Sequence, residues 1–131
     1  MAAQQRARTV WDGVYTLAQA ERGHDLYDER CSGCHGDDLG GDVVEHPSLA
    51  GGRFQDTWNG QTLGDLFDRI HRDMPMDEPG SLSRAETAQL VAFILSANRF
   101  PEGKQALPTD MPALNEIRIE SKKPKADKSR N

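Results

Sequence analysis

The chain has 131 residues and a net charge of −5, which fits one small domain and leaves little room for a second. Apolar residues make up 36% of the chain and aromatic residues 6%, which is little for the hydrophobic core of a protein of this size. We therefore expect a group other than the side chains to fill part of the core. The longest apolar run, Leu90–Leu95, has six residues against the roughly 20 of a membrane-spanning helix, and the acidic balance argues against nucleic-acid binding.

The first predicted helix runs from Thr16 to about Arg30, behind an N-terminal extension at residues 1–14. Thr16 and Gln19 have the spacing of a capping box, in which each side chain satisfies a backbone N–H at the other position. Four residues share one face of this helix: Ala20, Gly23, Leu26 and Tyr27.

The helix leads into Cys31-Ser32-Gly33-Cys34-His35, which contains both cysteines of the chain. A Cys-x-x-Cys-His run is the signature of c-type haem attachment. Thiols three residues apart on a turn of helix lie on the same side, so each can add to one vinyl group of the haem, and His35 follows as the proximal iron ligand. We therefore predict one haem c, attached covalently through Cys31 and Cys34, with its iron bound by His35.

Three other interpretations of the two cysteines are weaker. A redox-active pair is expected near a βαβ pattern, and the flanking sequence has no strand-rich alternation. A structural zinc site needs four protein ligands, but the sequence has neither a second cysteine pair nor a closely spaced histidine pair. A disulfide between Cys31 and Cys34 would close too small a loop to stabilise the fold much.

The glycine-rich stretch from Gly36 to Gly60 has no sustained period and is predicted to be a long loop, which is acceptable in a small domain if it wraps a cofactor. Thr62 and Asp65 mark the start of a second helix. Its apolar residues recur at helical spacing: Leu63, Leu66, Phe67 and Ile70. The helix ends before the segment 74–80, where two prolines prevent it from continuing.

A third helix is predicted from Ser83, which has capping-box spacing to Glu86, to about Asn98, and we place the domain itself at residues 15–100. Residues 101–120 contain two further prolines after Pro101 and are expected to form an extended segment that lies on the body. Residues 121–131 are a basic tail that we expect to be disordered.

An iron held by one histidine has a sixth coordination position, and the sequence offers four side chains for it: Met74, Met76, His46 and His71. Methionine with histidine is the electron-transfer combination, and two methionines in a polar loop with prolines are hard to explain as core residues. We expect Met74, at the end of the second helix, to be the ligand, with Met76 as the runner-up. A histidine ligand or an open position is the remaining alternative.

Four motifs, in this order along the chain, resemble those of the class I (monohaem) cytochromes c. They are residues 31–36, 47–51, 74–75 and 90–94, and the similarity covers roughly residues 15–98. The resemblance implies an all-α fold, with three main helices and loops wrapped around one covalent haem, in which the first and last helices cross near Gly23 and Phe93. It also implies that the carbonyl of Pro47 accepts a hydrogen bond from His35 and thereby fixes the imidazole ring.

Three flanking segments resemble a narrower group, the bacterial cytochrome c modules that accompany or are fused to quinoprotein dehydrogenases. They are residues 10–16, 79–83 and 96–101. This resemblance implies a periplasmic one-electron carrier, not an enzyme, that takes electrons from a dehydrogenase and passes them to a respiratory oxidase or another cytochrome. Such a carrier is a monomer or a subunit of a larger complex. Because proteins resembling this one acquire covalent haem outside the cytoplasm, we expect a secretory signal to precede the mature chain, and residues 1–5 have no apolar region that could belong to one.

Two further side chains are candidates for binding the haem propionates: the indole N–H of Trp58 and the guanidinium of Arg53. Their alternatives are simple packing for Trp58 and a solvated loop position for Arg53. The alternative to an electron carrier is a haem enzyme, or a gas or ligand sensor, whose sixth position is open. In that case His46 or His71 is the expected residue near the open position.

Overall fold

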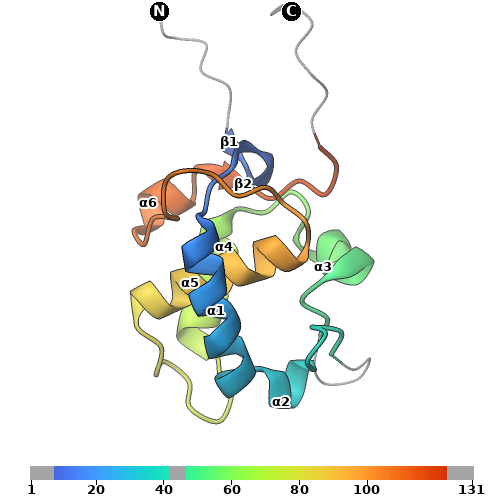
Figure 1. Cartoon of the computed structure of the whole chain (residues 1–131), viewed down its shortest axis with the longest axis vertical. Coiled ribbons are helices and arrows are strands. Elements are labelled where there is room, and N and C mark those ends of the chain that lie inside the picture. The colour runs from blue at the N-terminus through green and yellow to red at the C-terminus, as the bar shows by residue number, and fades with distance from the viewer. Residues whose placement is uncertain (1–7, 42–46, 124–131) are drawn as a thin grey trace, which may run out of the picture.

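The computed structural model describes residues 8–41 and 47–123, and Figure 1 shows their arrangement. Helices dominate this part of the chain, and the only strands in it are two of two residues each. The elements in chain order are β1 (Arg8–Thr9), the 3-10 turn η2 (Val10–Asp12), α1 (Leu17–Arg30), α2 (Ser32–His35), α3 (Gly51–Trp58), α4 (Leu63–Asp73), α5 (Arg84–Ala97), α6 (Met111–Leu114) and β2 (Ile117–Arg118). The predicted all-α fold is confirmed.

The three predicted main helices are α1, α4 and α5, and each begins directly after the predicted N-cap residue. Complete capping boxes are present at the starts of α4 and α5. At α1 only half of the predicted box forms: Thr16 accepts from the backbone N–H of Gln19. The Gln19 side chain instead forms two hydrogen bonds with the backbone of Leu107, at 2.7 and 3.2 Å, and so attaches the C-terminal segment to α1.

The prediction of one long loop from Gly36 to Gly60 was wrong for its last part, where α3 forms. Phe54 and Trp58 are four residues apart on α3, with ring centroids 6.4 Å apart, and Phe54 is only 1% exposed. This apolar pair gives the short helix a face to bury, although two glycines at its start disfavour a helix. Tertiary packing therefore overrides the local composition here.

The first and last main helices cross at Gly23, as expected. A Cβ atom at Gly23 would lie 1.8 Å from the Gln89 carbonyl oxygen and 2.9 Å from the Phe93 Cβ. Only glycine allows the two backbones to come this close. Tyr27, one turn further along α1, packs against Phe93 with ring centroids 5.3 Å apart. This crossing fixes the direction in which α1 delivers the cysteine motif.

The flanking segments pack onto the helical body. β1 pairs in parallel with β2, with Arg8 opposite Ile117. Trp11 donates from Nε1 to the Glu120 carbonyl oxygen at 2.8 Å, and the Tyr15 hydroxyl donates to the Phe100 carbonyl oxygen at 2.5 Å. Four apolar residues of the C-terminal segment join the single core: Leu107, Leu114, Ile117 and Ile119.

Residues 101–120 pack onto the body and include α6 and β2 as well as extended chain. The domain bounds at 15 and 100 stay a prediction, as does the character of the tail, of which only residues 121–123 are described. Figure 1 places β1 and β2 at one end of the molecule and α2 at the other.

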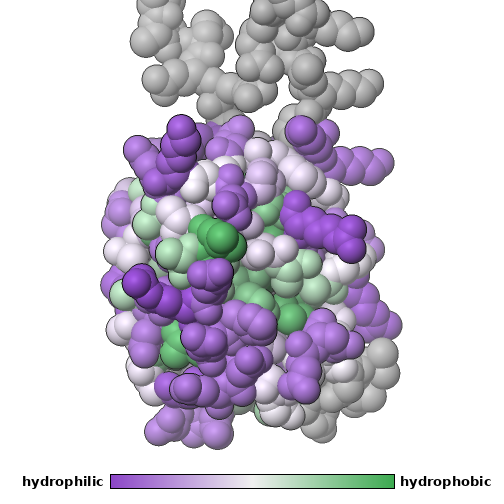
Figure 2. Space-filling model, viewed as in Figure 1, coloured by the Kyte–Doolittle hydropathy of each residue, from purple (hydrophilic) through white to green (hydrophobic). Residues whose placement is uncertain are grey.

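Hydrophilic residues cover most of the face shown in Figure 2, between small separate hydrophobic areas. None of the helices in the described ranges combines the length and the apolar character needed to cross a membrane.

Candidate haem site

The two cysteines lie where α1 ends and the single turn of α2 follows. Cys31 closes α1 through a 2.9 Å hydrogen bond from its N–H to the Tyr27 carbonyl oxygen, and the His35 N–H donates to the Cys31 carbonyl oxygen at 3.0 Å. Both thiols are free, with Cys31 half-buried and Cys34 exposed. Burial raises the pKa of the Cys31 thiol to about 11, so this group is protonated at neutral pH before attachment.

The imidazole of His35 is buried, with 8% of the residue exposed, and it is oriented by a backbone carbonyl. Its Nδ1 lies 2.8 Å from the carbonyl oxygen of Pro47. A carbonyl can only accept, so Nδ1 carries the proton in the neutral ring and Nε2 carries the lone pair. This is the tautomer that an Nε2 iron ligand requires. The contact implied by the resemblance is present, and its role beside a haem stays a prediction.

Backbone hydrogen bonds hold the turn that follows His35. The carbonyl oxygen of Gly36 accepts from the Tyr27 hydroxyl at 2.6 Å and from the Leu39 N–H at 3.1 Å. The Leu39 carbonyl in turn accepts from the Leu49 N–H at 2.7 Å. Gly36 has φ +85°, a backbone conformation that favours glycine. These contacts bring the segment after Pro47 back alongside the cysteine motif.

Asn98 fixes the same segment from the other side. This buried side chain, 5% exposed, donates from Nδ2 to the carbonyl oxygens of Leu49 and Ile94, at 2.9 and 2.8 Å. Its Oδ1 accepts from the Gly51 N–H at 2.9 Å. Sequence reasoning missed this role of Asn98 and that of the Tyr27 hydroxyl. The signal for Asn98 was weak: a lone amide at the end of an apolar helix.

The two methionines proposed for the sixth position differ in burial. Met74 directly follows α4 as its C-cap, is half-buried and packs against the core. Met76 is 68% exposed and is one of two exposed large hydrophobic residues in the described ranges. The loop that follows Met74 is attached to α1 by Arg30, whose Nη2 donates to Ser81 Oγ at 2.6 Å and lies 3.3 Å from Glu78 Oε1. This loop therefore lies beside the end of α1 that carries Cys31.

The remaining candidates are placed as follows. Trp58 and Arg53 both lie on α3, where Trp58 is half-buried and Arg53 is exposed. His71 stacks against Phe67 on α4, with ring centroids 5.9 Å apart. His46 lies outside the described residues.

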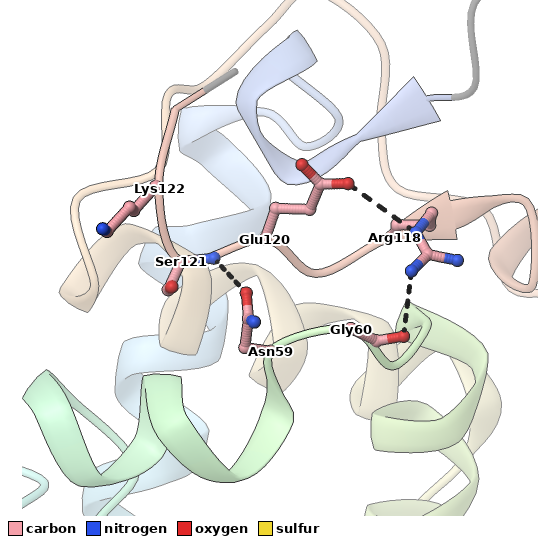
Figure 3. A pocket seen from close by; sticks show the side chains of 6 residues that line it. All are labelled: Asn59, Gly60, Arg118, Glu120, Ser121 and Lys122. Atoms are coloured by element: carbon pink, nitrogen blue, oxygen red, sulfur yellow. Dashed lines mark hydrogen bonds and ion pairs between the residues drawn. The ribbon is translucent and has the colours of Figure 1, made fainter. Parts of the chain in front are cut away.

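A polar hollow of about 400 Å³ lies at the β2 end of the molecule and is shown in Figure 3. Its lining residues are Asn59, Gly60, Arg118, Glu120, Ser121 and Lys122. Several of these residues interact with one another: the Ser121 N–H donates a hydrogen bond to Asn59 Oδ1 at 2.8 Å, and Arg118 forms an ion pair with Glu120 at 3.6 Å. The hollow contains none of the predicted site residues, and the described part of the chain has no cluster of three or more His, Cys, Asp or Glu side chains able to hold a metal ion.

A family model described as "Cytochrome C oxidase, cbb3-type, subunit III" matches residues 18–94, which is more than half of the chain. The chain belongs to this cytochrome c family. The matched region runs from the start of α1 to near the end of α5 and includes both cysteines, His35, Pro47 and Met74. No curated protein sequence matches the cytochrome significantly.

A solved structure with a similar fold is the sulfane dehydrogenase SoxCD from Paracoccus pantotrophus. The match has a TM-score of 0.50 at 25% sequence identity and covers 77% of the cytochrome. The cytochrome spans 55% of the length of that chain. Family and fold together identify a monohaem cytochrome c module that carries electrons by means of a haem.

The residues of the site fit the cofactor of this family, a covalent haem c. Cys31 and Cys34 are both uncrosslinked and have the required spacing, and the buried imidazole of His35 has its lone pair on Nε2. When bound, haem c supplies an iron that can gain or lose one electron. The chain supplies the thiols for attachment and an imidazole that is held by the Pro47 carbonyl.

Proposed function

We propose that this cytochrome is a periplasmic one-electron carrier, not an enzyme, whose iron has His35 and Met74 as axial ligands. Electrons arrive from a dehydrogenase and leave to a respiratory acceptor, an oxidase or another cytochrome. His and Met together raise the reduction potential of a haem and keep small ligands out. Both properties suit a carrier, since the ligands stay fixed while the iron changes charge.

The single observation that carries this proposal is the 2.8 Å contact between His35 Nδ1 and the Pro47 carbonyl oxygen. It holds a buried imidazole, directly after two free thiols, in the tautomer and orientation that an iron ligand needs. A structural histidine has no requirement for a neighbouring pair of unlinked cysteines at this spacing. The combination is therefore explained by haem ligation.

Burial supports Met74 over Met76 as the sixth ligand. A ligand thioether must leave the solvent, and Met74 already packs against the core at the end of α4. Met76 is 68% exposed, so it would have to turn inward with its loop. We assign Trp58 and Arg53, both on α3, to the haem propionates as hydrogen-bond donors.

The proposed electron donor follows from the structural neighbour. That protein is a sulfane dehydrogenase, and we infer that this cytochrome likewise serves a dehydrogenase, as a free monomer or as a subunit. We infer a periplasmic location for this cytochrome, because proteins of this kind acquire their covalent haem outside the cytoplasm.

The first test is an absorption spectrum of the purified holoprotein, oxidised and reduced, with acid-acetone extraction of the haem. We expect the haem to stay with the chain, and the oxidised form to show the weak red band of sulfur-to-iron charge transfer. Extraction of the haem would contradict covalent attachment. A five-coordinate spectrum with rapid carbon monoxide binding to the reduced form would favour the enzyme or sensor alternative.

A further inference from the structure

The loop between α4 and α5, residues 75–82, is held at its two ends by apolar contacts and in its middle by one arginine. Pro75 and Leu82 are buried. Two internal hydrogen bonds shape the loop, from the Glu78 N–H to the Pro75 carbonyl at 2.9 Å and from the Ser81 N–H to the Glu78 carbonyl at 3.2 Å. Within the described residues, its hydrogen bonds to the rest of the molecule all come from Arg30.

Arg30 connects the end of α1, which leads into the cysteine motif, with the loop 75–82, which follows Met74. It is the last residue of α1, and its peptide bond leads directly to Cys31. Its guanidinium reaches across to Ser81 Oγ at 2.6 Å and to Glu78 Oε1 at 3.3 Å. The Arg30 side chain is 27% exposed, so most of it is covered by its neighbours.

We propose that Arg30 is a positioning residue for Met74: it holds the loop 75–82 closed against the end of α1, and so keeps the methionine thioether at the iron. This inference rests on the proposed His35 and Met74 ligation. A partly exposed ion pair of this kind contributes little to global stability. Loop opening, however, is a local equilibrium with a small free energy, so the same contact changes the population of the open loop severalfold.

The test is a titration of the oxidised holoprotein with imidazole, which competes with Met74 for the iron. Loss of the red sulfur-to-iron band reports displacement of the thioether. We expect Arg30→Ala to raise the association constant for imidazole about two- to fivefold, the range expected from removing an exposed ion pair. Arg30→Lys keeps the charge but replaces the planar guanidinium, whose Nη2 makes both contacts, with a compact ammonium group, and should give a smaller increase. Ser81→Ala should change the constant in the same direction.

The matched control is Arg22→Ala, which removes the same charge from an exposed position on the same helix. An unchanged constant in Arg22→Ala supports a specific role of the Arg30 contact. An unchanged constant in Arg30→Ala, or an equal increase in Arg22→Ala, would overturn the inference while leaving the ligation intact. A wild-type protein without the red band would overturn the ligation itself, and with it the inference, before any variant is made.

Discussion

The hydroxyl of Tyr27 donates a hydrogen bond to the carbonyl oxygen of Gly36 across 2.6 Å. This contact spans the cysteine motif, because Tyr27 lies four residues before Cys31 and Gly36 directly follows His35. The ring of Tyr27 is at the same time packed against Phe93 of α5. One side chain therefore joins the helix crossing to the turn that presents the histidine.

Tyr27→Phe should remove the hydrogen bond and keep the ring packing. We expect the free energy of unfolding to fall by about 1 kcal/mol, the typical net contribution of one hydrogen bond, because Gly36 keeps Leu39 as a second donor. Denaturant unfolding of the holoprotein measures this difference. A loss of several kcal/mol would show that the hydroxyl does more than cap one carbonyl.

Alkaline pH should destabilise the fold through the same residue. Burial raises the pKa of Tyr27 well above its usual value of 10.0. Above about pH 10 the unfolded chain releases this proton while the folded chain retains it, so the folded state binds more protons and stability falls as pH rises. Unfolding midpoints measured from pH 8 to pH 11 should decline less steeply in Tyr27→Phe. Tyr15, whose pKa is also raised by burial, should account for part of the remaining slope.

Met74→Ala and Met76→Ala should differ completely in their spectra. Because Met74 is half-buried and Met76 is 68% exposed, we expect only Met74→Ala to abolish the red band of the oxidised form and to allow carbon monoxide to bind the reduced form. The two variants remove the same thioether from neighbouring positions, so each is the control of the other. The opposite result would transfer the ligand role to Met76.

Gly23→Ala should separate α1 from α5. A Cβ atom there would lie 1.8 Å from a backbone carbonyl oxygen of α5, which cannot move without the helix. We expect a loss of roughly 3 kcal/mol or more in the free energy of unfolding. Gly52→Ala is the control: a Cβ at Gly52 in α3 meets nothing within 4 Å, and alanine favours a helix by about 1 kcal/mol over glycine. Equal losses in both variants would contradict the close crossing.

The sequence predicted the main helices because their ends carry local signals. Thr62 and Ser83 cap α4 and α5 through contacts with residues three positions away. The Cys-x-x-Cys-His motif is equally local, since its chemistry depends only on spacing. These features could be predicted without any knowledge of the tertiary structure.

The position of residues 47–51 could not be predicted in the same way. Their course depends on partners far away in the chain, such as Asn98, which contacts Leu49 and Gly51. Residue type alone does not indicate which carbonyl an asparagine will bind. The helix α3 was missed for a related reason, because its stability comes from the burial of Phe54 in the shared core and not from the propensities of its own residues.

The pairing of β1 with β2 has a consequence for how such a module can be joined to other proteins. Arg8 and Ile117, near the two ends of the described chain, are neighbours in one small sheet at the end of the molecule away from α2 (Figure 1). Polypeptides attached before β1 and after β2 would depart from the same end, which leaves the cysteine motif facing away from both. A module with this geometry can be joined to a larger protein through two adjacent linkers, with α2 at the end opposite both of them.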